Sequence, residues 1–68
     1  MAVTYDKLWK LLIDKKMKRT DLIPLASISS NVIAKLGKDE YVALESLEKI
    51  CNVLKCDISD IVEFKHDK

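Results

Sequence analysis

The fold is decided by the stretch Ser27-Ile28-Ser29-Ser30-Asn31-Val32-Ile33-Ala34-Lys35-Leu36-Gly37. Ser29 can cap the N-terminus of a helix, because its hydroxyl accepts a backbone N–H two or three residues further on. Gly37 can end that helix, because glycine enters the left-handed conformation without a Cβ penalty. A helix of about two turns is not stable alone in water. The stretch therefore predicts a short helix over residues 30–36 that other helices hold in place.

The predicted helix has two chemically different faces. Ile33 and Leu36 lie on one face at helical spacing, and we expect this face to be buried. The other face carries the small or polar residues Ser30, Asn31, Ala34 and Lys35. That outer face is suited to hydrogen bonding rather than to apolar packing. The division is typical of the recognition helix of a helix-turn-helix DNA-binding domain.

Length and composition limit the classes of protein that are possible. The 68 residues make one domain, over 1–68, near the lower size at which a chain folds without disulfides or metals. With 49% apolar residues, one glycine and one proline, the sequence is neither disordered nor of low complexity. It contains no run of about 18 apolar residues and no signal-peptide pattern. We therefore expect a cytoplasmic protein with no membrane partner.

Charge is divided unevenly along the chain. Residues 1–38 hold eight Lys or Arg against three Asp or Glu, a net charge of +5. Residues 39–68 hold four against eight, a net charge of −4, so the whole chain carries +1. This polarity suits a first half that faces a polyanion while the second half stays in solvent. Because an uneven distribution of charge is common in proteins, it supports DNA binding only together with the other features of the sequence.

Residues that could carry catalysis or bind metal are few. Cys51 and Cys56, five apart, are too few to form a zinc site by themselves, and the single histidine, His66, offers no convincing partner. We expect the two cysteines to be small core residues in a reducing compartment. The only glycine, Gly37, cannot supply a glycine-rich phosphate loop. The sequence therefore predicts no enzyme activity, no metal, no cofactor and no small-molecule ligand.

Helical periodicity extends along nearly the whole chain. The clearest case is the segment in which Leu47, Ile50 and Leu54 recur at helical spacing. No segment alternates convincingly with a period of two, so no sheet is expected. The expected fold class is all-α, a compact bundle of five helices. The helices are expected at about residues 4–15, 19–26, 30–36, 43–54 and 58–63, followed by a frayed tail over residues 65–68.

Particular residues are expected to shape these helices. Thr4 is the expected cap of the first helix, and Pro24 falls within the first turn of the second helix if Thr20 caps it. Ile28 is the expected buried residue of the turn before the third helix. Trp9 suits either the core or a dimer contact. The predicted core comprises Leu8, Leu12, Met17, Leu22, Ile28, Ile33, Leu36, Leu44, Leu47, Ile50, Cys51, Leu54, Ile58 and Ile61, with Phe64 closing its lower end.

Four runs of the sequence resemble Cro/cI-type helix-turn-helix transcriptional regulators. They are residues 17–22 (MKRTDL), 28–36 (ISSNVIAKL), 44–51 (LESLEKIC) and 56–63 (CDISDIVE). The most specific part is AKLGK, at residues 34–38, followed by an acidic loop. The resemblance is greatest to short, stand-alone members from Gram-positive bacteria, including regulators of the VanU type. It implies a five-helix, lambda-repressor-like DNA-binding domain without enzyme activity that binds double-stranded DNA, usually as a homodimer.

The resemblance assigns base contacts by position. In this family the first residues of the recognition helix read base edges in the major groove, which here are Ser30, Asn31 and, one turn on, Lys35. Asn31 is suited to adenine, because an amide can bind N6 and N7 together. Lys35 can donate either to guanine or to a phosphate. Val32 is either partly buried or in contact with a thymine methyl group.

The same comparison assigns contacts to the DNA backbone. Arg19 and Ser29 match phosphate-contacting positions of the family, and Lys38 lies in the loop that approaches the backbone. Lys18 belongs to a basic run beside the start of the second helix, where backbone N–H groups and the helix dipole also favour phosphate. We therefore expect Lys18, Arg19, Ser29 and Lys38 to contact the DNA backbone.

Two positions depart from the family pattern. Many members pair an arginine in the first helix with a glutamate just after the recognition helix, and the corresponding residues here are Leu12 and Gly37. Because the arginine and the glutamate are both replaced, no buried charge is left without a partner. Pro24 replaces a residue that is ordinarily a good helix former. That substitution affects the start of the second helix and the exact phosphate contact of Arg19.

A second hypothesis stays open beside DNA binding. The chain could be a protein-interaction or antitoxin-like module that keeps the helix-turn-helix fold without specific DNA binding, using Tyr5, Trp9 or Tyr41 on a partner. A third arrangement is a monomer that binds DNA beside a larger regulator. Selection of binding sites from random duplexes separates the first two hypotheses, and sedimentation bears on the third.

Overall fold

The computed structural model describes residues 2–65, within which it has four α-helices, two 3₁₀ turns and one small sheet. In chain order the elements are β1 (Ala2–Thr4), α1 (Asp6–Asp14), the 3₁₀ turn η1 (Arg19–Asp21), α2 (Leu22–Ala26), α3 (Ser30–Gly37), α4 (Leu44–Leu54), the 3₁₀ turn η2 (Ile58–Asp60) and β2 (Glu63–Lys65). The expectation of a mostly helical fold is confirmed. Five α-helices are not observed, and the expectation that there is no sheet is wrong.

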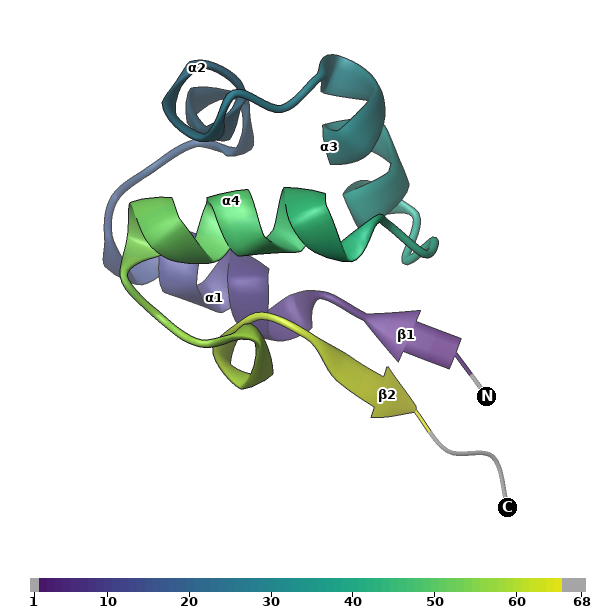
Figure 1. Cartoon of the computed structure of the whole chain (residues 1–68). Coiled ribbons are helices and arrows are strands. Elements are labelled where there is room, and N and C mark those ends of the chain that lie inside the picture. Colours follow the sequence, from purple (N-terminus) through teal and green to yellow (C-terminus); the bar gives the residue numbers. More distant parts are fainter. Residues whose placement is uncertain (1, 66–68) are drawn as a thin grey trace.

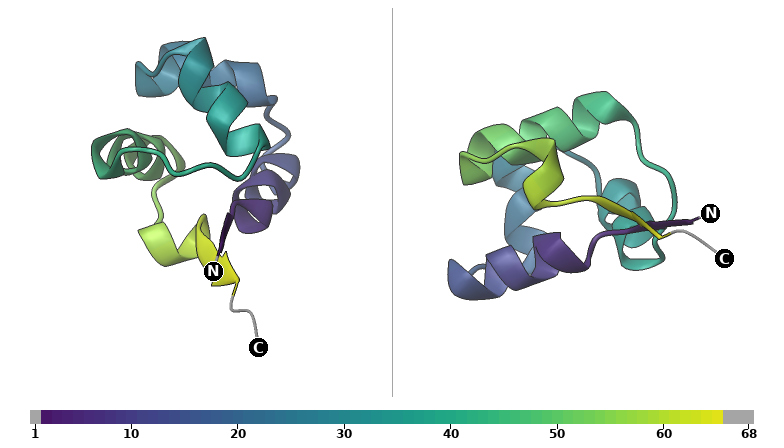
Figure 2. Two further views of the ribbon diagram at one scale, coloured as in Figure 1. Left: turned by 90° about the vertical axis from the view of Figure 1, so that its right-hand side faces the viewer. Right: turned by 90° about the horizontal axis from the view of Figure 1, so that it is seen from below.

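The helices are arranged around α4, which crosses the middle of the molecule (Figure 1). Helix α1 lies across the core from α4 (Figure 2), and the pair α2 and α3 lies on one side of them both (Figure 1). The sheet of β1 and β2, which joins the first and last described segments, lies on the opposite side (Figure 2). The sheet and the α2–α3 pair therefore occupy opposite ends of the domain.

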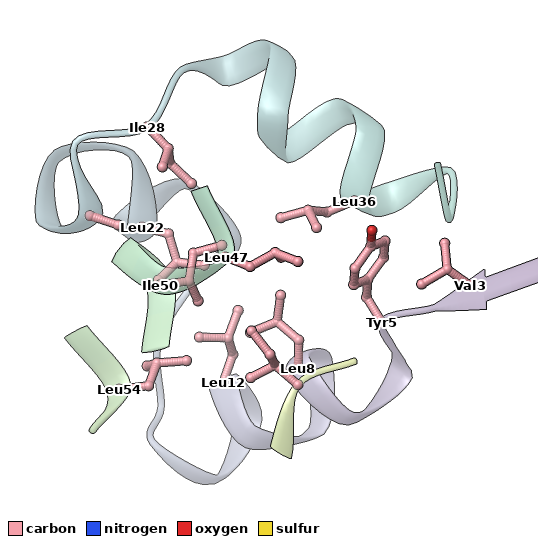
Figure 3. Packing of buried hydrophobic residues seen from close by; sticks show 12 residues of the cluster. Val3, Tyr5, Leu8, Leu12, Leu22, Ile28, Leu36, Leu47, Ile50 and Leu54 are labelled. Atoms are coloured by element: carbon pink, nitrogen blue, oxygen red, sulfur yellow. The ribbon is translucent and has the colours of Figure 1, made fainter. Parts of the chain in front are cut away.

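The core is formed by side chains that every α-helix contributes toward the centre (Figure 3). A fully buried leucine or isoleucine contributes about 1.5–3 kcal/mol to folding, so a few such residues hold this small domain together. The buried apolar residues are Val3, Tyr5, Leu8, Leu12, Leu22, Ala26, Ile28, Leu36, Leu47, Ile50, Leu54 and Ile61. Met17, Ile33 and Cys51, also expected in the core, are partly buried against it.

Helix α1 begins two residues later than expected, because Thr4 belongs to the sheet. Thr4 pairs with Glu63 and is buried, so it is not the residue that directly precedes the helix. Its hydroxyl still accepts a hydrogen bond from the N–H of Asp6, at 3.3 Å. Thr4 therefore accepts a hydrogen bond from the first residue of α1, although Tyr5, and not Thr4, occupies the cap position.

The second helical segment has the expected extent, although it starts as a 3₁₀ turn. The N–H of Lys18 donates to Oδ2 of Asp21 at 2.9 Å, so Thr20 is not the cap. Pro24 is the third residue of α2. An amide in the first turn has no partner within the helix, so proline is tolerated there.

Helix α4 closely matches the range expected from periodicity. Leu47, Ile50 and Leu54 are buried, as predicted. The prediction that Leu44 lies in the core is wrong, since its side chain is 68% exposed. As the first residue of α4 it follows the helical spacing, but no neighbouring element covers it at that end.

The last part of the chain differs most from the prediction. A helix over residues 58–63 was expected, whereas the structure has the single turn η2 and then β2, which pairs antiparallel with β1. Phe64 lies opposite Val3 in the sheet and is 58% exposed, so it does not close the core. Ile58 is also exposed, at 38%. Lys65 pairs with Ala2, which corrects the start of the expected tail, and residues 66–68 lie outside the described residues.

Candidate nucleic-acid interface

The turn between α2 and α3 sets how the two helices meet. Ser27 has φ 55° and ψ 44°, a left-handed conformation that is uncommon for a residue other than glycine. The N–H of Ile28 donates to the carbonyl of Ile23 at 3.2 Å, and the Ile28 side chain is buried as predicted. The buried isoleucine holds the strained turn in place. Helices α2 and α3 thereby form a helix-turn-helix unit.

Ser29 caps α3, as the sequence predicted. Its backbone is extended, and its hydroxyl oxygen accepts a hydrogen bond from the N–H of Val32 at 3.4 Å. The residue is exposed, so the hydroxyl hydrogen remains available to donate to a partner. The positive end of the α3 dipole lies at this same point. The start of α3 is therefore suited to an anionic or hydrogen-bonding partner.

The two faces of α3 are divided as expected. Leu36 is fully buried, while Val32 and Ile33 are partly buried against the core. Of the two alternatives expected for Val32, its position agrees with partial burial. The outer face is exposed and consists of Ser30, Asn31, Ala34 and Lys35. All three candidate base-contacting residues thus lie together on the open side of one short helix.

The end of α3 corrects the role expected for Gly37. No glycine has a positive φ, and Gly37 is the last residue of the helix. The left-handed residue is Asp39, with φ 56°, and the N–H of Glu40 donates back to the carbonyl of Lys35 at 3.0 Å. The turn therefore comes two residues later than predicted. It leaves Lys38 exposed at the end of the helix.

The candidate backbone-contacting residues lie at both ends of α3 and beside it. Lys18 and Arg19 are exposed at the start of η1, which packs against α3. A Cβ added to Gly37 would lie 3.5 Å from Nη1 of Arg19, so this guanidinium reaches the end of α3. The next residue there is Lys38. The structure thus brings Arg19 close to the Lys38 end of the helix, while Ser29 lies at the other end.

The contacts of Tyr5 were not foreseen from the sequence. Its hydroxyl donates to the carbonyl of Glu40 at 2.7 Å, and its N–H donates to Oδ1 of Asp39 at 3.4 Å. The ring is buried with its hydroxyl directed toward the end of α3 (Figure 3). Burial raises the pKa of the Tyr5 hydroxyl, and the nearby carboxylate of Asp39 raises it further. Tyr5 therefore holds the loop after α3, which includes Lys38, against the start of α1.

Tyr5→Phe is expected to lower the free energy of unfolding by about 1–2 kcal/mol, because the Glu40 carbonyl loses its hydrogen-bond donor. Urea denaturation followed by circular dichroism measures the change. Tyr41→Phe is the matched control, since Tyr41 is largely exposed, and it should leave stability unchanged. Equal effects of the two substitutions would show that the bond to Glu40 contributes nothing.

The cysteines lie away from α3, at the end of α4. Both are free and half-buried, and both pack against the core, close to the role expected for them. Burial raises the pKa of Cys51 to about 11, and the neighbouring Cys56 adds to the effect. The Cys51 thiol is therefore protonated at neutral pH and is a weak nucleophile.

The described residues were also searched for metal-binding groups and membrane-spanning helices. Within residues 2–65, no group of three or more His, Cys, Asp or Glu side chains is placed to hold a metal ion. None of the helices in that part of the chain is long and apolar enough to cross a membrane.

Comparisons with known proteins agree with this geometry. Residues 7–67 match the family model of the Cro/C1-type helix-turn-helix DNA-binding domain. YozG, a helix-turn-helix-type transcriptional regulator of Bacillus subtilis (strain 168), is 36% identical over 63 residues, covering 85% of this chain and 71% of YozG. The crystal structure of the transcriptional regulator VanUg superimposes with a TM-score of 0.87 at 50% identity, covering 91% of this chain and 83% of VanUg. This chain therefore belongs to the Cro/C1-type helix-turn-helix family of DNA-binding transcriptional regulators.

Proposed function

We propose that this protein regulates transcription by binding a specific DNA sequence, with α3 in the major groove. The observation that supports the proposal is the exposed outer face of α3, which is held by a capped start and a buried Leu36. An α-helix fits the width of the major groove, where each base pair presents a distinct pattern of donors and acceptors. The face presents hydrogen-bonding side chains at its start, where recognition helices reach base edges.

Each residue of this face has a chemical role in the proposal. Asn31 binds adenine through its amide, and Lys35, one turn on, donates to guanine O6 and N7 or to a phosphate. Ser30 can donate or accept, so it adapts to either kind of base pair. Asn31 therefore carries most of the expected base preference.

The residues around α3 supply contacts to phosphates in the same proposal. Lys18, Arg19 and Lys38 are exposed cations, and Ser29 offers its hydroxyl at the positive end of the helix. If four phosphates are neutralised per subunit, log K falls with log[salt] at a slope of about −3.6, since each contact releases counterions. This part of the binding is independent of DNA sequence.

Selection of binding sites from a random duplex library tests the proposal. A sequence-specific regulator should enrich one motif over several rounds, whereas the family fold without base reading should not. Weak and featureless DNA affinity, with no enriched motif, would contradict the proposal. That outcome would favour the alternative of a protein-interaction or antitoxin-like module.

We further propose that the protein binds its operator as a homodimer, through a face on α4 and η2. This face has the two exposed apolar side chains Leu44 and Ile58 beside an open hollow of about 630 Å³. Exposed apolar side chains that line a hollow often mark a protein-binding surface. The hollow is lined by Leu44, Glu45, Glu48, Cys51, Asn52, Cys56, Asp57 and Ile58. A symmetric dimer places half-sites about 34 Å apart along DNA, so the operator should be a repeat at that spacing.

Leu44→Glu is expected to convert a dimer into a monomer, because it places a charge among the carboxylates of this face. Sedimentation at micromolar concentration measures the oligomeric state. Leu25→Glu is the matched control, since Leu25 is an exposed leucine on α2, and it should leave the dimer intact. Added salt should tighten the wild-type dimer by screening its carboxylates. A wild-type protein that remains monomeric when bound to DNA would contradict the dimer proposal.

A further inference from the structure

Trp9 and Arg19 form a contact that joins α1 to the start of η1. The guanidinium carbon of Arg19 lies over the Trp9 ring, 3.9 Å from the ring centroid. Trp9 is half-buried and packs against the core, whereas Arg19 is exposed. A cation over the face of an indole is held by the ring's quadrupole, and tryptophan is the strongest such partner. The core thus presents a fixed ring to a charged side chain on the surface.

Gly37 leaves room for this guanidinium at the end of α3. A Cβ at that position would lie 3.5 Å from Nη1 of Arg19, so an added methyl group would touch it and a longer side chain would compete for the space. Gly37 has no positive φ, so its backbone conformation does not require glycine. The Arg19 guanidinium therefore lies where α1, η1 and the end of α3 meet.

The geometry points to Trp9 as a positioning residue for DNA binding, which holds Arg19 ready to bind a backbone phosphate. This inference rests on the proposed function. A guanidinium that lies flat on an aromatic ring keeps its N–H donors at its edge, directed away from the ring. Those donors remain available for bidentate binding of a phosphate. An exposed arginine otherwise samples many rotamers, and the ring restricts them before DNA arrives.

The inference distinguishes Arg19 from the other exposed cations. Lys18 is the next residue toward the N-terminus and is also exposed, but it lacks a planar group that could lie on the ring and still offer paired donors. Arg19→Lys keeps the charge and should nevertheless weaken binding to DNA. Lys18→Arg should not replace it, because the ring lies under residue 19.

A double-mutant cycle on Trp9 and Arg19 tests the inference. The probe is a random-sequence 20-base-pair duplex at low salt, so the test needs no operator. Arg19→Ala should make the salt slope shallower by about 0.9, the value for one phosphate contact. Trp9→Leu alone should lower affinity by about two- to fivefold, the range of an exposed cation–π contact. In the Arg19→Ala background, Trp9→Leu should have no further effect on affinity.

Controls separate positioning from a loss of structure. Trp9→Phe keeps an aromatic face and should weaken binding less than Trp9→Leu. Circular dichroism shows which variants remain folded, and the Trp9→Phe cycle replaces the Trp9→Leu cycle if the latter unfolds. Trp9 is the only tryptophan, so Arg19→Ala should also change the fluorescence emission of the free protein. An unchanged emission would contradict the contact itself.

The outcomes distinguish this inference from the proposed function. Equal loss of affinity from Trp9→Leu with and without Arg19 would show that Trp9 acts only through stability, and would overturn the inference. Zero coupling together with an enriched motif in the selection experiment would leave the proposed function intact. Coupling between Trp9 and Arg19 without any enriched motif would support the positioning role and contradict sequence-specific reading.

Discussion

Leu36→Ala is expected to lower the free energy of unfolding by about 2–5 kcal/mol, the range for a buried leucine that leaves a cavity. Leu36 is fully buried and is the residue through which α3 packs most deeply into the core. A domain of this size has a total stability of roughly 3–10 kcal/mol. The variant should therefore lose a large share of its stability and unfold at a clearly lower urea concentration. Urea denaturation followed by circular dichroism measures the loss.

Leu25→Ala is the control for that experiment. Leu25 is a leucine in the neighbouring helix α2, but it is 58% exposed, so its removal creates no cavity. Its effect should stay within about 0.5 kcal/mol, as for other surface substitutions. If the two variants lose the same stability, the packing of α3 through Leu36 does not hold the recognition unit in place.

Asn31→Ala is expected to weaken binding to the selected operator by about 5- to 150-fold, which corresponds to about 1–3 kcal/mol. The reason is the loss of a bidentate contact to one adenine. Asn31 is exposed, so the fold should be unaffected. A repeated selection with the variant should show relaxed preference at one base pair. Fluorescence anisotropy with a labelled operator measures the affinity.

Two comparisons make this result specific. Asn52→Ala removes an exposed asparagine from α4 and should leave the base preference unchanged. Lys18→Ala should weaken binding to all sequences alike and make the salt slope shallower, because Lys18 is assigned to a phosphate. If Asn31→Ala leaves both affinity and base preference unchanged, the outer face of α3 does not read the operator.

The sequence by itself determined the features that depend on neighbouring residues. The Ser29 cap, the helices α3 and α4 and the two faces of α3 were all predicted close to their observed bounds. Caps act within one turn, and apolar spacing repeats every three to four residues, so both signals lie within a short window of sequence. The same is true of Ile28, the buried residue of the turn. The candidate interface was therefore largely visible in one stretch.

Only the tertiary structure decided the features that join distant segments. Residues 63–65, where the end of a helix and the start of a frayed tail were expected, form a strand because β1 pairs with them from the other end of the chain. Strands of three residues are too short for a period of two to appear. Leu44 satisfies helical spacing and is nevertheless exposed, since burial depends on which element lies opposite.

Residues 27–37 show the same division between features set by neighbouring residues and features set by distant ones. The capped start of this stretch was determined locally, whereas its end depends on residues far away. Gly37 was predicted to adopt a left-handed turn, but Asp39 does so, and the Tyr5 side chain holds the loop after it. Gly37 instead leaves space for Arg19, which lies over Trp9 of α1. The sequence determined which helix faces outward, and packing between helices decided which side chains support it, because those contacts join residues that no local pattern links.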